Sequence, residues 1–159
     1  MNVFISHAYS DEPLAHRLAQ TLERAGLRVW DARDEVLPGD NWAAKAGEAL
    51  EEAEAMIVLL TPDALRSSQV RREIYYALGK EDFSGRLFPV LVGPKNVLTD
   101  EAVPWILRNL QMIHLTEQGE KAAEEEAFGQ ITRALLKTAE RQGSRSAIAY
   151  DEGEAAAGV

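Results

Sequence analysis

A strand signal and a helix signal follow one another in residues 56–78, which read MIVLLTPDALRSSQVRREIYYAL. Residues 56–60 form an unbroken apolar run, which is typical of a parallel strand buried on both faces. Thr61-Pro62 then matches a helix start, with a capping hydroxyl followed by proline at the first helical position. A second start follows at Ser67-Ser68, and the apolar residues after it recur at helical spacing. The stretch therefore predicts a central strand followed by a helix with one buried face.

Glu73 borders the apolar stripe of this helix, next to Val70 and Ala77. In an open α/β sheet, ligands bind in the crevice at the carboxyl ends of the strands, and the first turns of the following helix face that crevice. An acidic residue near a helix N-terminus also interacts favourably with the helix dipole. Its position alone therefore leaves a functional and a purely structural role open for Glu73.

Four more strand signals alternate with helix patterns along the chain. The strands are expected at residues 3–5, 27–30, 87–92 and 111–115. Right-handed crossovers between successive strands require a parallel sheet with helices on both faces. We expect an α/β fold with a flavodoxin-like five-stranded parallel sheet in the order 2-1-3-4-5.

A single domain is expected to occupy residues 1–140 of the 159-residue chain. Its last helix should run from residue 117 to about residue 140. Beyond that point the apolar pattern gives way to Gly, Ser, Ala and acidic residues. Residues 141–159 are therefore predicted to form a mobile tail.

Composition excludes several classes of partner. The chain carries 17 basic and 26 acidic residues, for a net charge of -9, which argues against binding to a phosphate backbone. No apolar run approaches the roughly 18 residues of a membrane span, and no basic leader precedes the first strand. The absence of cysteine fits a reducing compartment. We expect a cytoplasmic protein without nucleic-acid or membrane partners.

Common nucleotide and metal motifs are also missing. The sequence contains no G-x-G-x-x-G after the first strand and no G-x-x-x-x-G-K-[ST] loop. His7, His16 and His114 have no metal-ligand spacing among themselves, so no metal site is expected. A phospho-acceptor receiver domain would need an aspartate at the end of the third strand and a lysine at the end of the fifth, and neither is present.

Five segments in order resemble the bacterial form of the Toll/interleukin-1 receptor (TIR) domain family. They are VFISHAYSD at 3–11, GLRVW at 26–30, RDEVLPGDNW at 33–42, IVLLTP at 57–62 and SSQVRREI at 67–74. The resemblance covers about residues 1–140. It implies that the Pro-Gly loop at about residues 31–41 is the BB loop, and that the catalytic glutamate on the helix after the third strand is Glu73.

The same resemblance implies cleavage of the nicotinamide–ribose bond of NAD, in the manner of antiphage-defence proteins. NAD would be the substrate, with no cofactor and no metal, and a homo-oligomer formed by TIR–TIR contacts would be the active assembly. Residues expected to bind the substrate lie at the first strand end, in and after the BB loop and at the helix start: Phe4, Ser6, His7, Arg33, Asp34, Trp42 and Ser68.

One position departs from the family pattern. Many TIR enzymes carry tryptophan four residues before the glutamate, where its ring stacks on the substrate, and this chain has Gln69 there. Trp42 is a candidate replacement, although it could equally pack in the core.

Two other functions stay open. A non-enzymatic TIR module would act by self-association alone, and nicotinamide release from NAD would distinguish it from an enzyme. A nucleoside deoxyribosyltransferase-like enzyme also uses a glutamate in a related fold, and would turn over deoxynucleosides instead of NAD.

Overall fold

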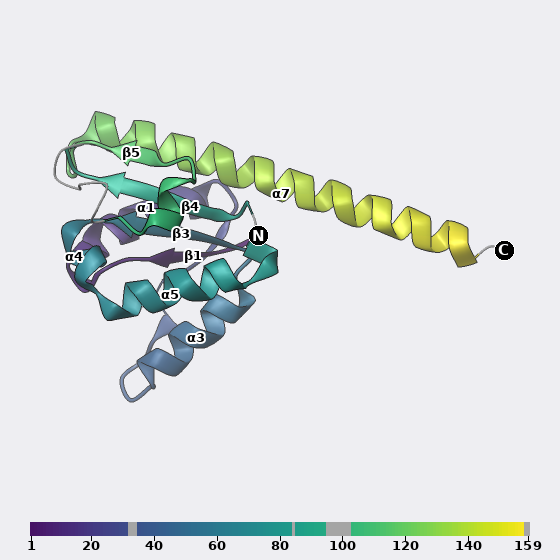
Figure 1. The fold of residues 1–159 in the computed structure, drawn as a ribbon, viewed down its shortest axis with the longest axis horizontal. Helices are drawn as coiled ribbons and strands as arrows, with labels where there is room; N and C mark the ends of the chain where they lie inside the picture. The colour runs from purple at the N-terminus through teal and green to yellow at the C-terminus, as the bar shows by residue number, and fades with distance from the viewer. Residues whose placement is uncertain (32–34, 84, 95–102, 158–159) are drawn as a thin grey trace.

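Five parallel strands form one sheet in the order β2-β1-β3-β4-β5 (Figure 1). The computed structural model describes residues 1–31, 35–83, 85–94 and 103–157. The strands are β1 (Asn2–Ser6), β2 (Arg28–Trp30), β3 (Ala55–Leu60), β4 (Leu87–Val92) and β5 (Ile113–Leu115). Every neighbouring pair is parallel. The flavodoxin-like fold and the strand order expected from the sequence are confirmed.

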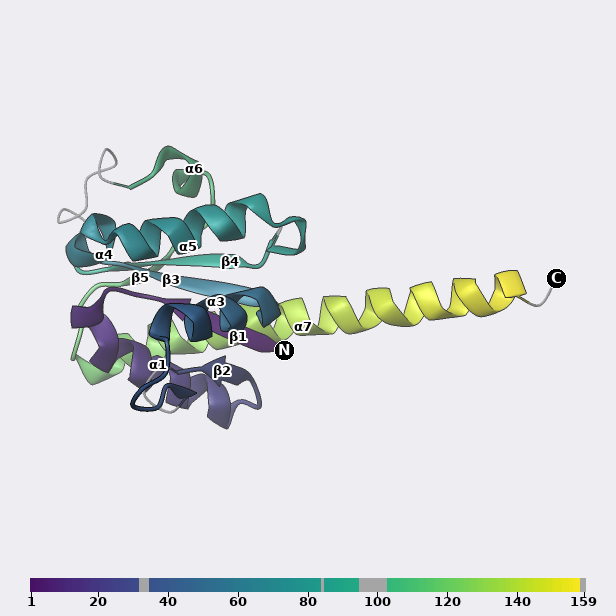
Figure 2. The same ribbon diagram turned by 90° about the horizontal axis from the view of Figure 1, so that it is seen from below.

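Helices cover both faces of the sheet (Figure 2). On one face lie α1 (Glu12–Arg24) and α7 (Lys121–Ala157). On the other lie α3 (Trp42–Glu52), α4 (Pro62–Arg66), α5 (Ser68–Gly79) and α6 (Trp105–Arg108). Two short 3-10 helices, η1 (Tyr9–Asp11) and η2 (Glu81–Phe83), complete the described elements.

The central strand β3 explains why the core has two halves. All six of its residues are buried. Because strand side chains alternate, Ala55, Ile57 and Leu59 pack with α1 and α7, whereas the other three pack with α3, α4 and α5. An unbroken apolar run is what such a doubly covered strand requires.

Both helix starts expected after β3 are present. The Thr61 hydroxyl accepts a hydrogen bond from the Ala64 amide at 3.0 Å and begins α4. The Ser67 hydroxyl accepts one from the Val70 amide at 3.3 Å and begins α5. The break between these helices sets the direction of α5, and therefore the direction of the side chains in its first two turns.

The last helix is longer than its apolar pattern indicated. We expected it to end near residue 140, but α7 continues to Ala157 and extends beyond the sheet (Figures 1 and 2). Residues 141–157 include five alanines, and the high helix propensity of alanine favours a helix although the apolar pattern has ended. The expected helix end near residue 140 is therefore wrong, while the mobile tail at residues 141–159 and the domain boundary at residue 140 stay predictions.

Within the described ranges, no helix combines the length and the apolar character needed to cross a membrane.

Candidate active site

Glu73 lies where the carboxyl ends of β1 and β3 meet the start of α5. Val70, Ile74 and Ala77 bury one side of α5 against the second half of the core. Glu73 borders this stripe, and its carboxylate reaches back over the end of β1 to Ser6. Since Ser6 pairs with Val58 of β3, the acid lies over the middle of the sheet edge.

Two donors hold the Glu73 carboxylate. The Ser6 hydroxyl donates to Oε2 at 2.6 Å, and the Gln69 side-chain amide donates to Oε1 at 3.0 Å. The side chain is only 8% exposed. Burial raises the pKa of Glu73, and this effect is opposed by the two hydrogen bonds and by the positive potential of His7 and Arg72. The result is an oriented carboxyl group whose proton affinity is raised.

An aromatic cleft of about 330 Å³ opens on one side of Glu73. Phe4 and Trp30 form part of its wall, with stacked rings whose centroids are 5.6 Å apart and whose planes differ by 10°. Trp42 adds a third ring, and it is 41% exposed. The cleft therefore supplies the aromatic surface that position 69 lacks.

The other polar residues of the cleft come from the segments that follow β1 and β2. They are His7, Tyr9, Glu12 and Asp31. The Nδ1 atom of His7 is 2.8 Å from the Ala8 carbonyl oxygen, and that of His16 is 2.7 Å from Oδ2 of Asp31.

The cleft contains four of the residues predicted from the sequence, namely Phe4, His7, Trp42 and Glu73. Ser6 is completely buried and contacts Glu73, so it positions the carboxylate. Ser68 is exposed on the first turn of α5, and it lines neither the aromatic cleft nor the second hollow beside Glu73 that is described below. The hydroxyl that caps α5 belongs to its neighbour Ser67. The predicted residues Arg33 and Asp34 lie outside the described ranges.

Two contributors were missed by sequence reasoning. Trp30 ends the strand beside β1, so the rule that ligands bind at strand ends was a usable signal for it. Gln69 was considered only as a missing ring, although its spacing of four residues from Glu73 on a helix favours a side-chain contact.

A second hollow, of about 370 Å³, lies between α3 and α5 on the other side of Glu73. It shares Trp42, Gln69 and Glu73 with the aromatic cleft. Its remaining lining residues are mostly small or apolar, with one arginine: Ala43, Ala46, Gly47, Leu50, Glu51, Arg72 and Tyr76. Glu73 therefore lies at the junction of two hollows.

A second buried carboxyl group supports the same sheet edge. The Thr61 hydroxyl donates to Oδ2 of Asp11, so the end of β3 is tied to the segment after β1. Burial raises the pKa of Asp11, and the hydrogen bond from Thr61 opposes that shift. This pair fixes the backbone around the cleft without lining it.

Among the residues that the structure describes, no group of three or more His, Asp or Glu side chains could hold a metal ion.

Comparison with known proteins gives a consistent result. A family model described as "TIR domain" matches residues 3–132. No curated protein sequence matches the chain.

Several solved structures share the fold at low sequence identity. The TIR domain of the Toll-related receptor TRR-2 from Hydra magnipapillata is 21% identical, with a TM-score of 0.62 over 82% of this chain and 94% of that one. The TIR-STING receptor from C. gigas, solved with 2',3'-cGAMP, is 24% identical, with a TM-score of 0.66 over 83% of this chain and 38% of that one. The TIR domains of the Roq1 resistosome, which recognises the effector XopQ, are 15% identical, with a TM-score of 0.65 over 84% of this chain and 98% of that one.

Proposed function

Because the chain belongs to the TIR domain family, we propose that it is an enzyme that cleaves the nicotinamide–ribose bond of NAD. The observation that carries the proposal is Glu73, a buried carboxylate held by Ser6 and Gln69 at the wall of an aromatic cleft. The resemblance of residues 67–74 to the catalytic segment of TIR enzymes supports the same assignment.

The reaction suits a site with one carboxylate. Nicotinamide in NAD is already cationic, so it leaves with the electron pair of the broken C–N bond and needs no general acid. The ribose then resembles an oxocarbenium ion, which a nearby negative charge stabilises. Glu73 is partly screened from water, and its charge therefore acts more strongly than it would in bulk solvent.

The rings of Trp30 and Trp42 give the leaving group a binding surface, and the buried ring of Phe4 supports it by stacking on Trp30. A flat cationic ring gains both apolar burial and cation–π attraction against aromatic faces. Once nicotinamide has left, water attacks C1 of the ribose and gives ADP-ribose, with a proton passing to Glu73 or to solvent. Attack by a group of the substrate itself gives a cyclic isomer of ADP-ribose instead.

The test is nicotinamide release by the wild type, Glu73→Gln and Glu124→Gln. Glu124 is a matched control because it is also 8% exposed and hydrogen-bonded, but it lies on α7. We expect Glu73→Gln to lower kcat by about 10²-fold or more, which corresponds to about 2.7 kcal/mol, while Glu124→Gln keeps most of its turnover. Near-wild-type turnover by folded Glu73→Gln would refute the assignment.

A second candidate function is a non-enzymatic TIR module that acts by self-association. The observation in its favour is a pair of exposed aromatic side chains, Tyr75 (65% exposed) and Trp105 (70% exposed), which line a separate hollow between α5 and α6. A wild type that releases no nicotinamide from NAD under conditions where it oligomerises would favour this function. In either case, the family resemblance suggests a role for homo-oligomers in antiphage defence in the cytoplasm.

A further inference from the structure

We propose that the hollow between α3 and α5 binds the ADP half of NAD while the aromatic cleft binds the nicotinamide half. The substrate would then lie across Glu73, with the scissile bond at the junction of the two hollows. This inference rests on the proposed function and goes beyond it, because it assigns a second binding site and an orientation to the substrate.

The sizes of the two hollows favour a shared ligand. They measure about 330 and 370 Å³, near the lower end of the roughly 300–1,000 Å³ typical of ligand pockets. NAD consists of two nucleotides, and each hollow is on the scale of one. Trp42, Gln69 and Glu73 line both hollows. A single molecule can therefore occupy both hollows, with the Glu73 carboxylate beside the bond that joins its two halves.

The aromatic cleft suits the cationic half. Besides Glu73, it is lined by the acidic residues Glu12 and Asp31, and its aromatic residues are Phe4, Tyr9, Trp30 and Trp42. A positively charged planar ring is attracted to such a surface, whereas a diphosphate is repelled by its carboxylates.

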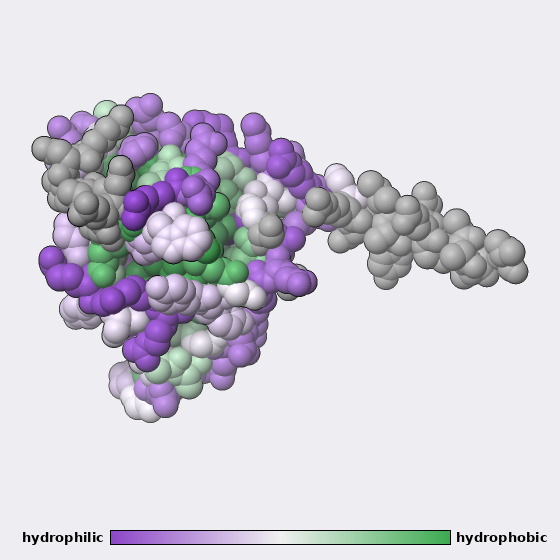
Figure 3. Space-filling model, viewed as in Figure 1, coloured by the Kyte–Doolittle hydropathy of each residue, from purple (hydrophilic) through white to green (hydrophobic). Residues whose placement is uncertain are grey.

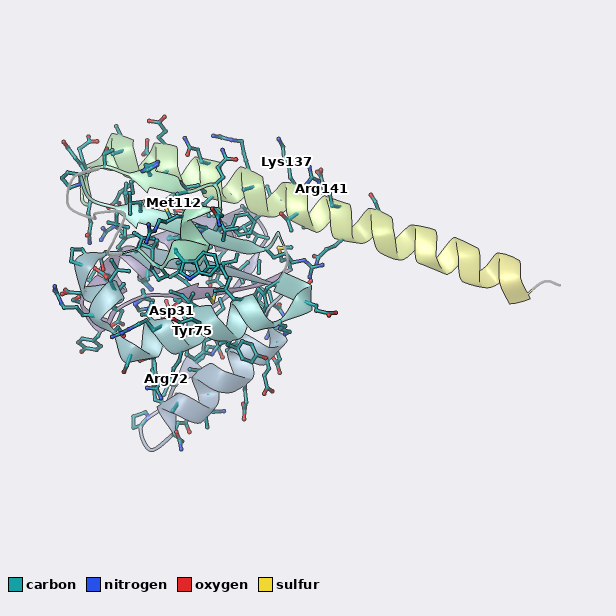
Figure 4. The ribbon with its side chains drawn as sticks, in the orientation of Figure 1. Asp31, Arg72, Tyr75, Met112, Lys137 and Arg141 are labelled. Carbon is teal, nitrogen blue, oxygen red and sulfur yellow. The ribbon has the colours of Figure 1, made fainter. Side chains whose placement is uncertain are left out.

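The hollow between α3 and α5 suits the anionic half. Arg72 lies on the side of α5 that faces α3 (Figure 4), and its guanidinium matches the geometry of phosphate oxygens. Leu50 and Tyr76 provide apolar and aromatic surface on which an adenine ring can stack. Arg72 and Tyr76 are four residues apart on α5, so they lie on the same face of the helix and line the same hollow. One ligand can therefore place its phosphates at Arg72 and its base at Tyr76.

Two carboxylates also face this hollow. In the proposed orientation, Glu73 lies beside the ribose whose bond is cleaved. Glu51 lies at the opposite end of the hollow, near the C-terminal ends of α3 and α5. Lys80 is close to that end, since its ammonium group donates to the Glu51 carbonyl at 2.8 Å and lies 5.9 Å from the centre of the Tyr76 ring. Lys80 therefore adds a positive charge near that end of the hollow, and Arg72 supplies one beside Glu73.

Calorimetric titration of ADP into the full chain tests the site without any turnover. We expect Arg72→Met to weaken ADP binding at least tenfold and to raise the KM for NAD by a similar factor. Arg71→Met is the matched control, because Arg71 is the preceding residue on the same helix but lines the separate hollow between α5 and α6. Figure 3 shows apolar surface gathered between these two helices. Equal ADP affinity in the two variants would overturn the proposal.

A steric variant gives an independent result. Gly47 lines the hollow, and apart from its chain neighbours and the backbone of its own helix, no atom lies within 4 Å of the position that a Cβ would take there. Gly47→Leu should therefore fold normally and fill the hollow, and we expect it to abolish measurable ADP binding. Folded Gly47→Leu with wild-type ADP affinity would refute the site, as would a wild type that binds no ADP at millimolar concentrations.

The two proposals fail in different ways. A chain that binds ADP in a manner sensitive to Arg72 and Gly47, but releases no nicotinamide, would refute NAD cleavage and leave the binding site intact. A chain that turns over NAD, with ADP affinity unchanged in both variants, would refute the binding site and leave cleavage intact.

Discussion

Ser6→Ala removes one of the two donors that hold the Glu73 carboxylate. The hydroxyl donates to Oε2 at 2.6 Å, and both side chains are buried. Alanine is smaller by one oxygen atom, so the change deletes the hydrogen bond and leaves the packing of β1 nearly intact. Gln69 then remains as the only described side-chain donor to the carboxylate.

The cost depends on pH. A hydrogen bond to a charged group contributes about 1.5–3 kcal/mol, and one between neutral groups about 0.5–1.5 kcal/mol. For a domain of this size, the larger loss lowers Tm by about 3–12 °C. We therefore expect the larger loss at pH values above the folded pKa of Glu73, where its carboxylate is ionised, and the smaller loss at pH values below it.

The sign of the pH effect follows from the pKa of Glu73. Burial raises that pKa in the folded protein, so the folded state binds a proton more tightly than the unfolded state does. The contribution of Glu73 to stability is therefore complete below its unfolded pKa and is lost as pH rises through its folded pKa. Because the Ser6 hydrogen bond opposes the raised pKa, Ser6→Ala should raise it further. If catalysis needs the ionised carboxylate, the acid limb of the kcat profile should move to higher pH.

Thermal melts and kcat–pH profiles of Ser6→Ala and Thr61→Val test this reasoning. Thr61→Val removes the other buried hydroxyl–carboxyl bond at the same sheet edge, to Asp11, and should destabilise the fold without moving the acid limb. An unchanged acid limb in Ser6→Ala, or an equal movement in both variants, would show that Ser6 does not control the ionisation of Glu73.

Three other perturbations probe the rest of the domain. Gly39 has a φ of 93°, a backbone conformation that valine rarely adopts, so Gly39→Val should distort its loop and abolish NAD turnover. Its Tm should change by only the few degrees that about 1 kcal/mol produces. Full activity of this variant would show that the loop conformation is unimportant. Arg17 donates two hydrogen bonds to the Glu124 carboxylate, at 2.7 and 3.0 Å, and lowers the pKa of Glu124 below its unfolded value. The ionised carboxylate therefore stabilises the fold at pH values above the unfolded pKa, and this contribution is lost as pH falls through the folded pKa. Arg17→Ala should therefore lower the unfolding free energy by about 1 kcal/mol at pH 7 and by less near pH 3, and urea titrations at both pH values measure this. If the exposed Pro38–Gly39 loop packs on a neighbouring subunit, NAD turnover per chain should rise steeply with protein concentration, whereas flat activity from a monomer by light scattering would exclude that packing.

The fold was predictable because its main signals are local. The buried run of β3 and the capping hydroxyls of Thr61 and Ser67 depend on neighbouring residues only, and each appears where the sequence placed it. The length of α7 was not predictable from an apolar stripe, since the apolar pattern of the sequence fades near residue 140 while the helix continues to Ala157.

The site was predictable only in part, because it depends on contacts between distant segments. The spacing of Glu73 on α5 indicated its direction, but its contact with Ser6 spans 67 positions of the chain. The hollow between α3 and α5 had no local signal at all. In the sequence, the small residues Ala43, Ala46 and Gly47 indicate only a helix. The packing of α3 beside α5 shows that their small side chains leave a hollow between the two helices.

The contact between the first and last helices has a consequence during protein synthesis. Arg17 of α1 bonds Glu124 across 107 positions, and Phe128 and Ile131 of α7 cover the same side of the sheet as Leu18 of α1. A ribosome releases α1 and the first strands long before α7 has been made. Until α7 emerges, one apolar face of the nascent sheet lacks half of its cover, and it offers a surface for chaperone binding or aggregation. Such late, long-range closure is also slow, so the rate at which α7 docks should limit how quickly new chains reach the folded state.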